Sequence, residues 1–137
     1  MNSAVSFPYH PANSAETEGV LPYLPVALSL EKRIIQVEAL LDSGASVNVL
    51  PYTIGLQLGA IWDAQTTPLQ LAGNLARAEA RGLLVMAQIA SFEPIRLVFA
   101  WTRSDNIPVI MGQMNFFQTF NVCFFRSQFT FEIQLNT

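Results

Sequence analysis

The sequence predicts a mainly β domain with one short helix near the C-terminus. Residues 24–30 and residues 129–135 alternate apolar and polar side chains at the period of two that is typical of half-buried strands. Residues 113–120 form the one convincing helical pattern. A length of 137 residues, 51% of them hydrophobic, suits one domain with one core and excludes a disordered chain.

The first residues differ in character from the rest. Residues 1–20 are mostly polar, and Pro8 and Pro11 stand among small residues. We expect them to form an N-terminal arm of low order, followed by the domain itself at residues 21–137. The arm could instead be a removable leader, or a strand that orders on assembly.

A hairpin follows the arm. Residues 24–30 predict its first strand, residues 31–33 supply a charged turn, and residues 34–41 predict the return strand. The return strand runs directly into the sequence Asp-Ser-Gly at residues 42–44. An aspartate is therefore expected at the end of a buried strand, inside a tight turn.

Shorter elements occupy the middle of the chain. Residues 47–50 predict a short strand, and residues 52–58 predict a helical turn that ends at a glycine. Residues 66–72 and residues 81–90 predict the strands of a long hairpin. The dipeptide Gly73-Asn74 is a turn signal, so we expect a mobile tip, although the Ala-rich tip could instead be one turn of helix.

The last third predicts two more strands before the terminal one. Residues 95–101 predict one strand, and residues 108–111 predict a short buried strand that stops at Gly112. The helix of residues 113–120 follows. The terminal strand, residues 129–135, has one apolar face, so it needs a surface on which to pack.

Charge and hydropathy exclude several classes of partner. The net charge is −3, and the seven lysines and arginines are scattered, so no basic stripe could neutralise phosphates and nucleic acid is not an expected partner. No apolar run approaches the length of a membrane span. The N-terminus has neither the basic nor the apolar region of a secretory signal, so a cytoplasmic protein is expected.

Cysteine and histidine are almost absent, and this limits the chemistry. The chain has one cysteine, Cys123, and one histidine, His10, so an intrachain disulfide and a His/Cys metal cluster are impossible. A nucleophilic triad could use only His10, which lies in the arm. Carboxylate chemistry remains, without a metal or another cofactor. Cys123 is expected to be a small buried hydrophobe.

The turn at residues 42–46 fits the requirements of such chemistry. Two carboxylates close together share a proton, so one acts as base and the other as acid on a water held between them. Asp42 supplies a carboxylate on a turn, Gly44 permits close approach of a substrate backbone, and the Ser43 hydroxyl can fix the geometry. Ser46 could donate a hydrogen bond to the carboxylate or simply close the turn.

The second carboxylate has no obvious source within the chain. No second Asp-Ser-Gly or Asp-Thr-Gly is present, and Asp63, Asp105 and Glu132 lack the Ser-Gly context. Two chains that meet about a two-fold axis could each supply Asp42. Asp-Ser-Gly by itself is more often an ordinary turn. The evidence for a catalytic role therefore comes from the apolar strands around it and from the aliphatic-Gly-helix pattern downstream.

With that pattern in place, the chain resembles the retropepsin-like aspartic proteases, the single-domain class of retroviral proteases and their relatives. Residues 40–46 resemble the active-site turn of the family, and residues 109–112 with the following helix resemble its second signature. The hairpin around residues 73–78 stands where the family carries its flap. The order and spacing of these motifs match the family over residues 21–135, and the sequence as a whole resembles cyanobacterial members.

The resemblance implies a closed, bent β-barrel-like domain that forms a homodimer and binds a peptide or protein substrate. Asp42 would be the catalytic carboxylate, and Ser43 would make a hydroxyl contact between subunits. The C-terminal strand would join a sheet with its symmetry mate. Together with the catalytic Asp42, Ser43 and Gly44, the implied substrate-binding residues are Ala45, Ser46, Ala72, Gly73, Asn74, Leu75 and Ile110.

Two positions depart from the viral pattern. Viral members often carry an acidic residue where Ser46 stands, and an arginine where Gln113 stands. The charged network that braces the viral dimer is therefore missing here, and the dimer is expected to be weaker or differently braced. The Gly-rich flap is also replaced by Gly73 followed by alanine and arginine.

We therefore predict an aspartic endopeptidase that hydrolyses peptide bonds through a water activated by two Asp42 carboxylates, one from each subunit. The alternative is a catalytically silent dimerisation or peptide-binding module on the same fold. Cleavage of an unstructured protein at mildly acid pH distinguishes the two functions.

Overall fold

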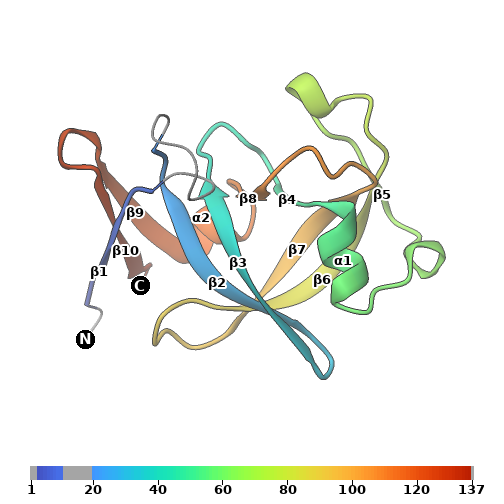
Figure 1. Ribbon diagram of the computed structural model, residues 1–137, viewed down its shortest axis with the longest axis horizontal. Helices are drawn as coiled ribbons and strands as arrows, with labels where there is room; N and C mark the ends of the chain where they lie inside the picture. Colours follow the sequence, from blue (N-terminus) through green and yellow to red (C-terminus); the bar gives the residue numbers. More distant parts are fainter. Residues whose placement is uncertain (1–2, 11–19, 137) are drawn as a thin grey trace.

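The computed structural model of the chain describes residues 3–10 and 20–136. Within them, two sheets and two short helices form the domain, and the predicted mainly β class is confirmed (Figure 1). The strands are β1 (Val5–Pro8), β2 (Tyr23–Leu30), β3 (Arg33–Leu41), β4 (Asn48–Leu50), β5 (Pro68–Leu69), β6 (Ala80–Gln88), β7 (Ile95–Thr102), β8 (Val109–Met111), β9 (Phe120–Phe125) and β10 (Thr130–Leu135). The helices are α1 (Tyr52–Gln57) and α2 (Phe116–Thr119), and the 3-10 turns are η1 (Trp62–Ala64), η2 (Gly73–Leu75) and η3 (Arg126–Gln128).

The larger sheet closes on itself. Its strand order is β2-β3-β8-β4-β7-β6-β5, and an additional pairing of β2 with β6 joins the first strand to the sixth. Closure gives each strand of the barrel an inner and an outer face. On β2 the alternating residues Leu24, Val26 and Leu28 are at most 1% exposed, as the period-two pattern predicts.

Aromatic side chains fill the end of the barrel next to α1. Trp62 and Trp101 are buried with ring centroids 5.1 Å apart. Helix α1 passes so close to Trp101 that a Cβ on Gly55 would lie 2.2 Å from the indole ring. The helical turn expected at residues 52–58 is therefore present, and the left-handed Gly59 (φ 85°) follows it.

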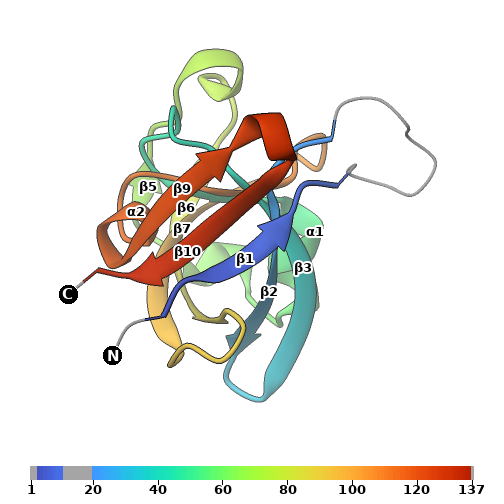
Figure 2. The same ribbon diagram turned by 90° about the vertical axis from the view of Figure 1, so that its left-hand side faces the viewer.

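The second sheet packs beside the barrel in the order β1-β10-β9 (Figure 2). Its inner face contributes Phe131 and Ile133, both fully buried, to the main core. Strand β10 lies between β9 and β1 of its own chain, so both of its edges are occupied. Neither edge of β10 is therefore open for direct pairing with another subunit, and the sheet expected with a symmetry mate stays a prediction.

The N-terminal residues show a related difference. Residues 5–8, which fall inside the arm expected at residues 1–20, form β1 and pair with β10. His10 continues this path through an isolated bridge to Leu21 and lies 3.0 Å from the Glu38 carboxylate. The rest of the arm, residues 11–19, lies outside the described residues.

The expected C-terminal helix is shorter than the sequence pattern. Helix α2 begins only at Phe116, and the N–H groups of Gln113 and Met114 before it donate to the carbonyls of Ala45 and Ser46. Asn115, with φ 68°, then redirects the chain. Residues 120–125, for which the sequence pattern predicts no strand, pair with β10 as β9.

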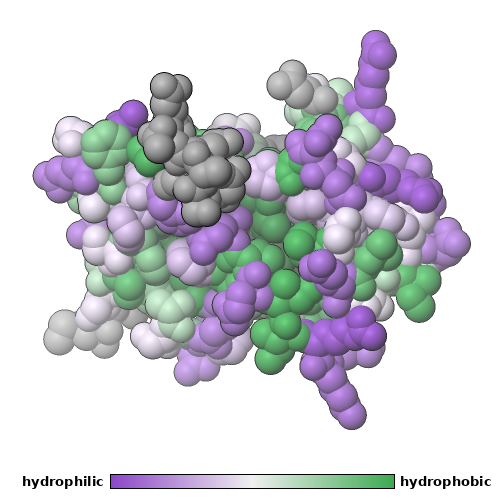
Figure 3. All heavy atoms as spheres, in the orientation of Figure 1, coloured by the Kyte–Doolittle hydropathy of each residue, from purple (hydrophilic) through white to green (hydrophobic). Residues whose placement is uncertain are grey.

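The surface carries scattered apolar side chains. Figure 3 shows them interspersed with hydrophilic ones over the face seen in Figure 1. Cys123 is exposed on β9, so the expected burial of this residue is wrong. No helix in the described part of the chain is both long and apolar enough to span a bilayer.

Candidate active site

The predicted Asp-Ser-Gly turn joins β3 to β4 at one end of the barrel. Strand β8 runs parallel to β3 and touches β4 through the pair Val49–Ile110, so it lies between the two strands that the turn connects. The Asp42 N–H donates to the Met111 carbonyl at 3.0 Å, which extends the β3–β8 ladder into the turn. The backbone of Asp42 is therefore held by a strand that is far away in the sequence.

The carboxylate of Asp42 is positioned by its own turn. The Gly44 N–H donates to Asp42 Oδ1 at 2.9 Å, and the Ala45 N–H donates to the Asp42 carbonyl at 3.1 Å. A Cβ on Gly44 would lie 3.3 Å from Oδ1, so the glycine leaves the carboxylate uncrowded. Asp42 is half-buried, whereas Ser43 and Gly44 are exposed.

Hydrogen bonds of the buried Asn48 side chain hold the segments behind the turn together. The Asn48 side chain is 0% exposed. Its Nδ2 donates to the Val98 carbonyl at 3.1 Å, and its Oδ1 accepts the Gly112 N–H at 2.8 Å. Gly112 itself has no room for a side chain, because a Cβ would lie 2.5 Å from the Val47 carbonyl oxygen and 2.7 Å from that of Ala45.

Gln113 adds a brace on the exposed side. Its Nε2 donates to the Ser43 carbonyl at 2.6 Å. This neutral amide contacts the backbone of its own chain. Ser46 is tied nearby through its carbonyl, which accepts the Met114 N–H at 3.0 Å.

The turn opens into a cavity of about 740 Å³. The opposite wall is the tip of the β5–β6 hairpin, which we call the flap tip (residues 70–79). An apolar cluster that contains the buried Val49, Leu71 and Ile110 forms part of the lining. The full lining is Asp42, Gly44, Ala45, Ser46, Val47, Val49, Leu71, Ala72, Gly73, Leu75, Ser104, Asn106, Ile107 and Ile110.

Most of the predicted site residues meet at this cavity. Of the ten predicted from the sequence, eight line it; Ser43 is exposed on the turn, and the side chain of Asn74 lies outside the described part. Sequence reasoning missed the support from Asn48 and six of the lining residues: Val47, Val49, Leu71, Ser104, Asn106 and Ile107. No local signal marks these residues, because long-range pairing brings them to the turn.

Strand pairing and the Arg81 side chain hold the base of the flap tip. Strand β5 pairs with β6 through Pro68–Arg81 and Leu69–Ala80, and the tip contains the 3-10 turn η2, in agreement with the expected turn of helix. Arg81 Nη1 donates to the carbonyls of Trp62 (2.8 Å) and Gln65 (3.2 Å), and its guanidinium lies 4.6 Å from the Trp62 ring. The base is thus fixed to η1.

Among the residues that line the cavity, Asp42 is the one acidic side chain. Asp105 lies in an adjoining loop but binds elsewhere: its carboxylate accepts the Thr53 N–H and the Thr53 hydroxyl, both at 2.8 Å. These two hydrogen bonds lower the pKa of Asp105. The described chain therefore offers half of a carboxylate pair at this cavity.

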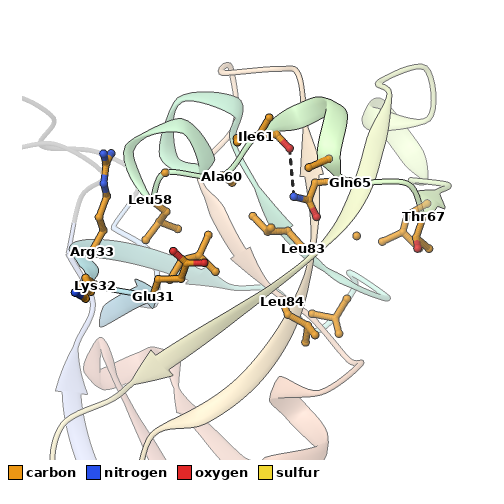
Figure 4. A pocket seen from close by; sticks show the side chains of 16 residues that line it. Glu31, Lys32, Arg33, Leu58, Ala60, Ile61, Gln65, Thr67, Leu83 and Leu84 are labelled. Atoms are coloured by element: carbon orange, nitrogen blue, oxygen red, sulfur yellow. Dashed lines mark hydrogen bonds between the residues drawn. The ribbon is translucent and has the colours of Figure 1, made fainter.

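A larger cavity, of about 1080 Å³, lies on another part of the barrel (Figure 4). Its walls come from the β2–β3 hairpin turn, from residues 58–67 and from β6, and Glu31 is its one carboxylate. None of the residues of the Asp-Ser-Gly turn lines it. Within residues 3–10 and 20–136, no group of three His, Cys, Asp or Glu side chains could hold a metal ion.

Comparison with known proteins identifies the fold. The sequence matches no protein-family model and no curated protein. The structure is similar to a retropepsin-like aspartic protease from Rickettsia conorii, with a TM-score of 0.66 and 9% identity over 98% of this chain and 93% of that one. It is also similar to EIAV protease complexed with the inhibitor HBY-793, with a TM-score of 0.51 and 19% identity over 71% of this chain and 86% of that one. The chain therefore has the fold of the retropepsin-like aspartic proteases.

Proposed function

We propose that this protein is an aspartic endopeptidase that acts as a homodimer. One observation carries the proposal: Asp42 is the one acidic side chain on a cavity between the turn and the flap tip, and it lies on an exposed turn at which a second copy can dock. A two-fold axis beside this turn places the partner's Asp42 next to the first. The similarity to solved retropepsin-like proteases supports the same assignment.

The chemistry requires both carboxylates and one shared proton. A water lies between them; the ionised carboxylate takes a proton from the water as its oxygen attacks the scissile carbonyl carbon. The protonated carboxylate gives its proton to the carbonyl oxygen, which yields a neutral tetrahedral diol. The diol collapses as the C–N bond breaks. The leaving nitrogen takes a proton from the first carboxyl group, and one diol hydroxyl gives its proton to the second carboxylate as it becomes the new carbonyl.

The residues around Asp42 take supporting roles in the proposal. Gly44 and Ala45 lie along the extended substrate backbone, and Ser46 lies beside them on the same wall. The apolar lining, with Val49, Leu71 and Ile110, favours apolar substrate side chains near the cleaved bond. Flap-tip residues 72–75 cover the substrate from above, and the Ser43 hydroxyl contacts its counterpart between subunits.

The decisive experiment replaces the carboxylate. Asp42→Asn keeps the shape of the side chain but removes the proton-transfer group, so we expect cleavage of an unstructured protein at mildly acid pH to fall by roughly 10³-fold or more. Asp63→Asn, which alters an exposed carboxylate away from the cavity, is the matched control. Circular dichroism checks that both variants fold.

Full activity in Asp42→Asn would rule out this mechanism. A purified wild-type dimer that binds peptides without cleaving them would favour the silent binding module instead.

A further inference from the structure

The loop that joins β7 to β8 forms a side wall of the candidate active site. Ser104, Asn106 and Ile107 line the cavity into which the Asp42 turn opens. Ile107 is half-buried and packs against the apolar cluster of the cavity, whereas Asn106 is exposed. A peptide that fills the cavity would therefore meet this loop as well as the turn and the flap tip.

Asp105 lies in the middle of this loop but does not line the cavity. Its carboxylate binds helix α1 instead: Oδ1 accepts the Thr53 N–H and Oδ2 accepts the Thr53 hydroxyl, both at 2.8 Å. One residue, 52 positions earlier in the chain, thus engages both oxygens. The loop therefore presents Ser104 and Asn106 to the cavity while the side chain between them is tied to α1.

The backbone of the loop supplies little further support. The Ser104 carbonyl accepts the Tyr52 N–H at 3.2 Å, and the Asn106 N–H donates to the Ser104 hydroxyl within the loop itself. In the described chain, residues 105–107 make hydrogen bonds to other segments only through the Asp105 carboxylate. The position of Asn106 therefore depends on this carboxylate rather than on backbone hydrogen bonds.

Helix α1, to which the carboxylate binds, is held tightly against β7. The Trp101 indole N–H donates to the Tyr52 carbonyl at 3.1 Å, and the two rings stack with centroids 5.7 Å apart. A Cβ on Gly55 would lie 2.2 Å from the same indole, so the helix has no space in which to shift toward it. The Arg103 guanidinium lies 5.4 Å from the Tyr52 ring. A loop fixed to α1 is therefore fixed to the barrel.

We infer that Asp105 is a positioning residue of the proposed protease: through Thr53 it holds the loop in the place where Asn106 and Ile107 receive a substrate side chain. This inference rests on the proposed function, because it concerns the substrate of the same cavity. Asp105 acts on peptide binding and not on the proton transfers, which belong to Asp42.

The charge of Asp105 suits this role. The two hydrogen bonds from Thr53 lower the pKa of the Asp105 carboxyl below its ordinary value of 3.8, so the group stays ionised at mildly acid pH. Hydrogen bonds to an ionised acceptor are stronger than those to a neutral one. The loop is therefore held under the conditions in which a shared proton on the Asp42 pair would support cleavage.

The decisive variant removes both acceptors. For Asp105→Ala we expect the KM for a quenched fluorescent peptide, which carries one cleavage site of casein, to rise about tenfold. The kcat should stay within about twofold of the wild-type value, because β8, which holds the Asp42 backbone, remains paired with β3 and β4. Glu93→Ala, which removes an exposed carboxylate between β6 and β7, is the matched control and should change neither constant.

Two milder variants keep the inference testable if Asp105→Ala does not fold. Thr53→Val removes the hydroxyl donor and keeps the N–H donor, so we expect KM to rise about threefold at unchanged kcat. Asp105→Asn keeps an oxygen for the Thr53 N–H and should restore most of the wild-type KM. Rescue by asparagine and not by alanine is the result expected of a positioning side chain.

Binding of fluorescein-labelled casein, measured by anisotropy, separates this inference from the protease function. A folded Asp105→Ala variant with wild-type KM, or with a loss confined to kcat, would overturn the inference, while cleavage by the wild type would leave the protease function standing. A wild-type protein that binds casein without cleaving it, and a Kd about tenfold higher in Asp105→Ala, would support the role of Asp105 in peptide binding and overturn the protease function.

Discussion

The turn at residues 42–46 and the flap tip at residues 70–79 face each other across one cavity, but they are held in different ways. Side chains from distant segments fix the turn: Asn48 accepts the Gly112 N–H, and Gln113 donates to the Ser43 carbonyl. Within the flap tip the hydrogen bonds are mainly local, as in those from the N–H groups of Leu75 and Ala76 to residues 72 and 73, and the long-range backbone bond, from the Arg103 N–H to the Glu79 carbonyl, lies at its end.

This difference in hydrogen bonding indicates which wall of the cavity can move. A turn built on long-range hydrogen bonds and buried groups opens only when the barrel itself is disturbed. A tip with local bonds opens at low cost once its base is held, as Arg81 holds it at the carbonyls of Trp62 and Gln65. The proposed protease function would use this division, because the carboxylates would have to stay in place while substrate enters under the flap tip.

The largest expected loss of stability comes from a substitution that disturbs the turn at residues 42–46. Gly112→Ala places a Cβ against the carbonyl oxygens of Val47 and Ala45, and neither backbone can yield without moving the turn. We expect a loss of roughly 3 kcal/mol in unfolding free energy by denaturant titration, together with loss of activity.

Gly82→Ala is the control for this variant. Its Cβ would meet Leu69 at 3.7 Å, an ordinary contact, so stability should be close to that of the wild type. Equal stability of the two variants would contradict the account of a rigid turn.

A smaller loss of stability is expected when the support of the turn loses one hydrogen-bonding side chain. Asn48→Ala leaves the buried Gly112 N–H and Val98 carbonyl without partners, so we expect about 1–3 kcal/mol of destabilisation. Proteolytic activity per folded molecule should also fall, because Gly112, which follows β8, loses its hydrogen bond to Asn48, and β8 holds the backbone of Asp42. Asn136→Ala, at an exposed position, should change neither quantity.

The flap side should respond differently. Gly73 has φ 62°, and a Cβ added to it would have no atom within 4 Å, so Gly73→Ala introduces backbone strain without a clash. We expect a cost of about 1 kcal/mol, with faster hydrogen exchange confined to residues 70–79. If exchange rose equally in β3 and β8, the flap tip and the turn would not be independent.

The smallest effect is expected at Asp105, outside both walls. The folded pKa of this carboxyl lies below its ordinary value of 3.8, so its contribution to stability is present above that pH and is lost as the pH falls through the folded pKa. Asp105→Asn should therefore lower the melting temperature slightly at neutral pH and not at the acid end. A difference that grew on acidification would contradict the assigned hydrogen bonds to Thr53.

The sequence by itself determined the strands and the turn that carries Asp42. Period-two alternation is a local property, so β2 and β10 could be predicted from their own residues, and the Asp-Ser-Gly turn could be predicted from the strand before it. The pattern also showed that one chain holds one such carboxylate. These features depend on neighbours in the sequence and on the chemistry of single side chains.

Only the tertiary structure decided which groups remain free for a partner. Helix α2 starts late because the positive φ of Asn115 does not fit a right-handed helix, and Cys123 is exposed because it shares the outer face of its sheet with Glu132. Strand β10 looked unpaired in the sequence, yet β1 and β9 occupy both of its edges. Strand pairing joins residues that are far apart in the chain, and for that reason no local pattern could show which strand edges stay open.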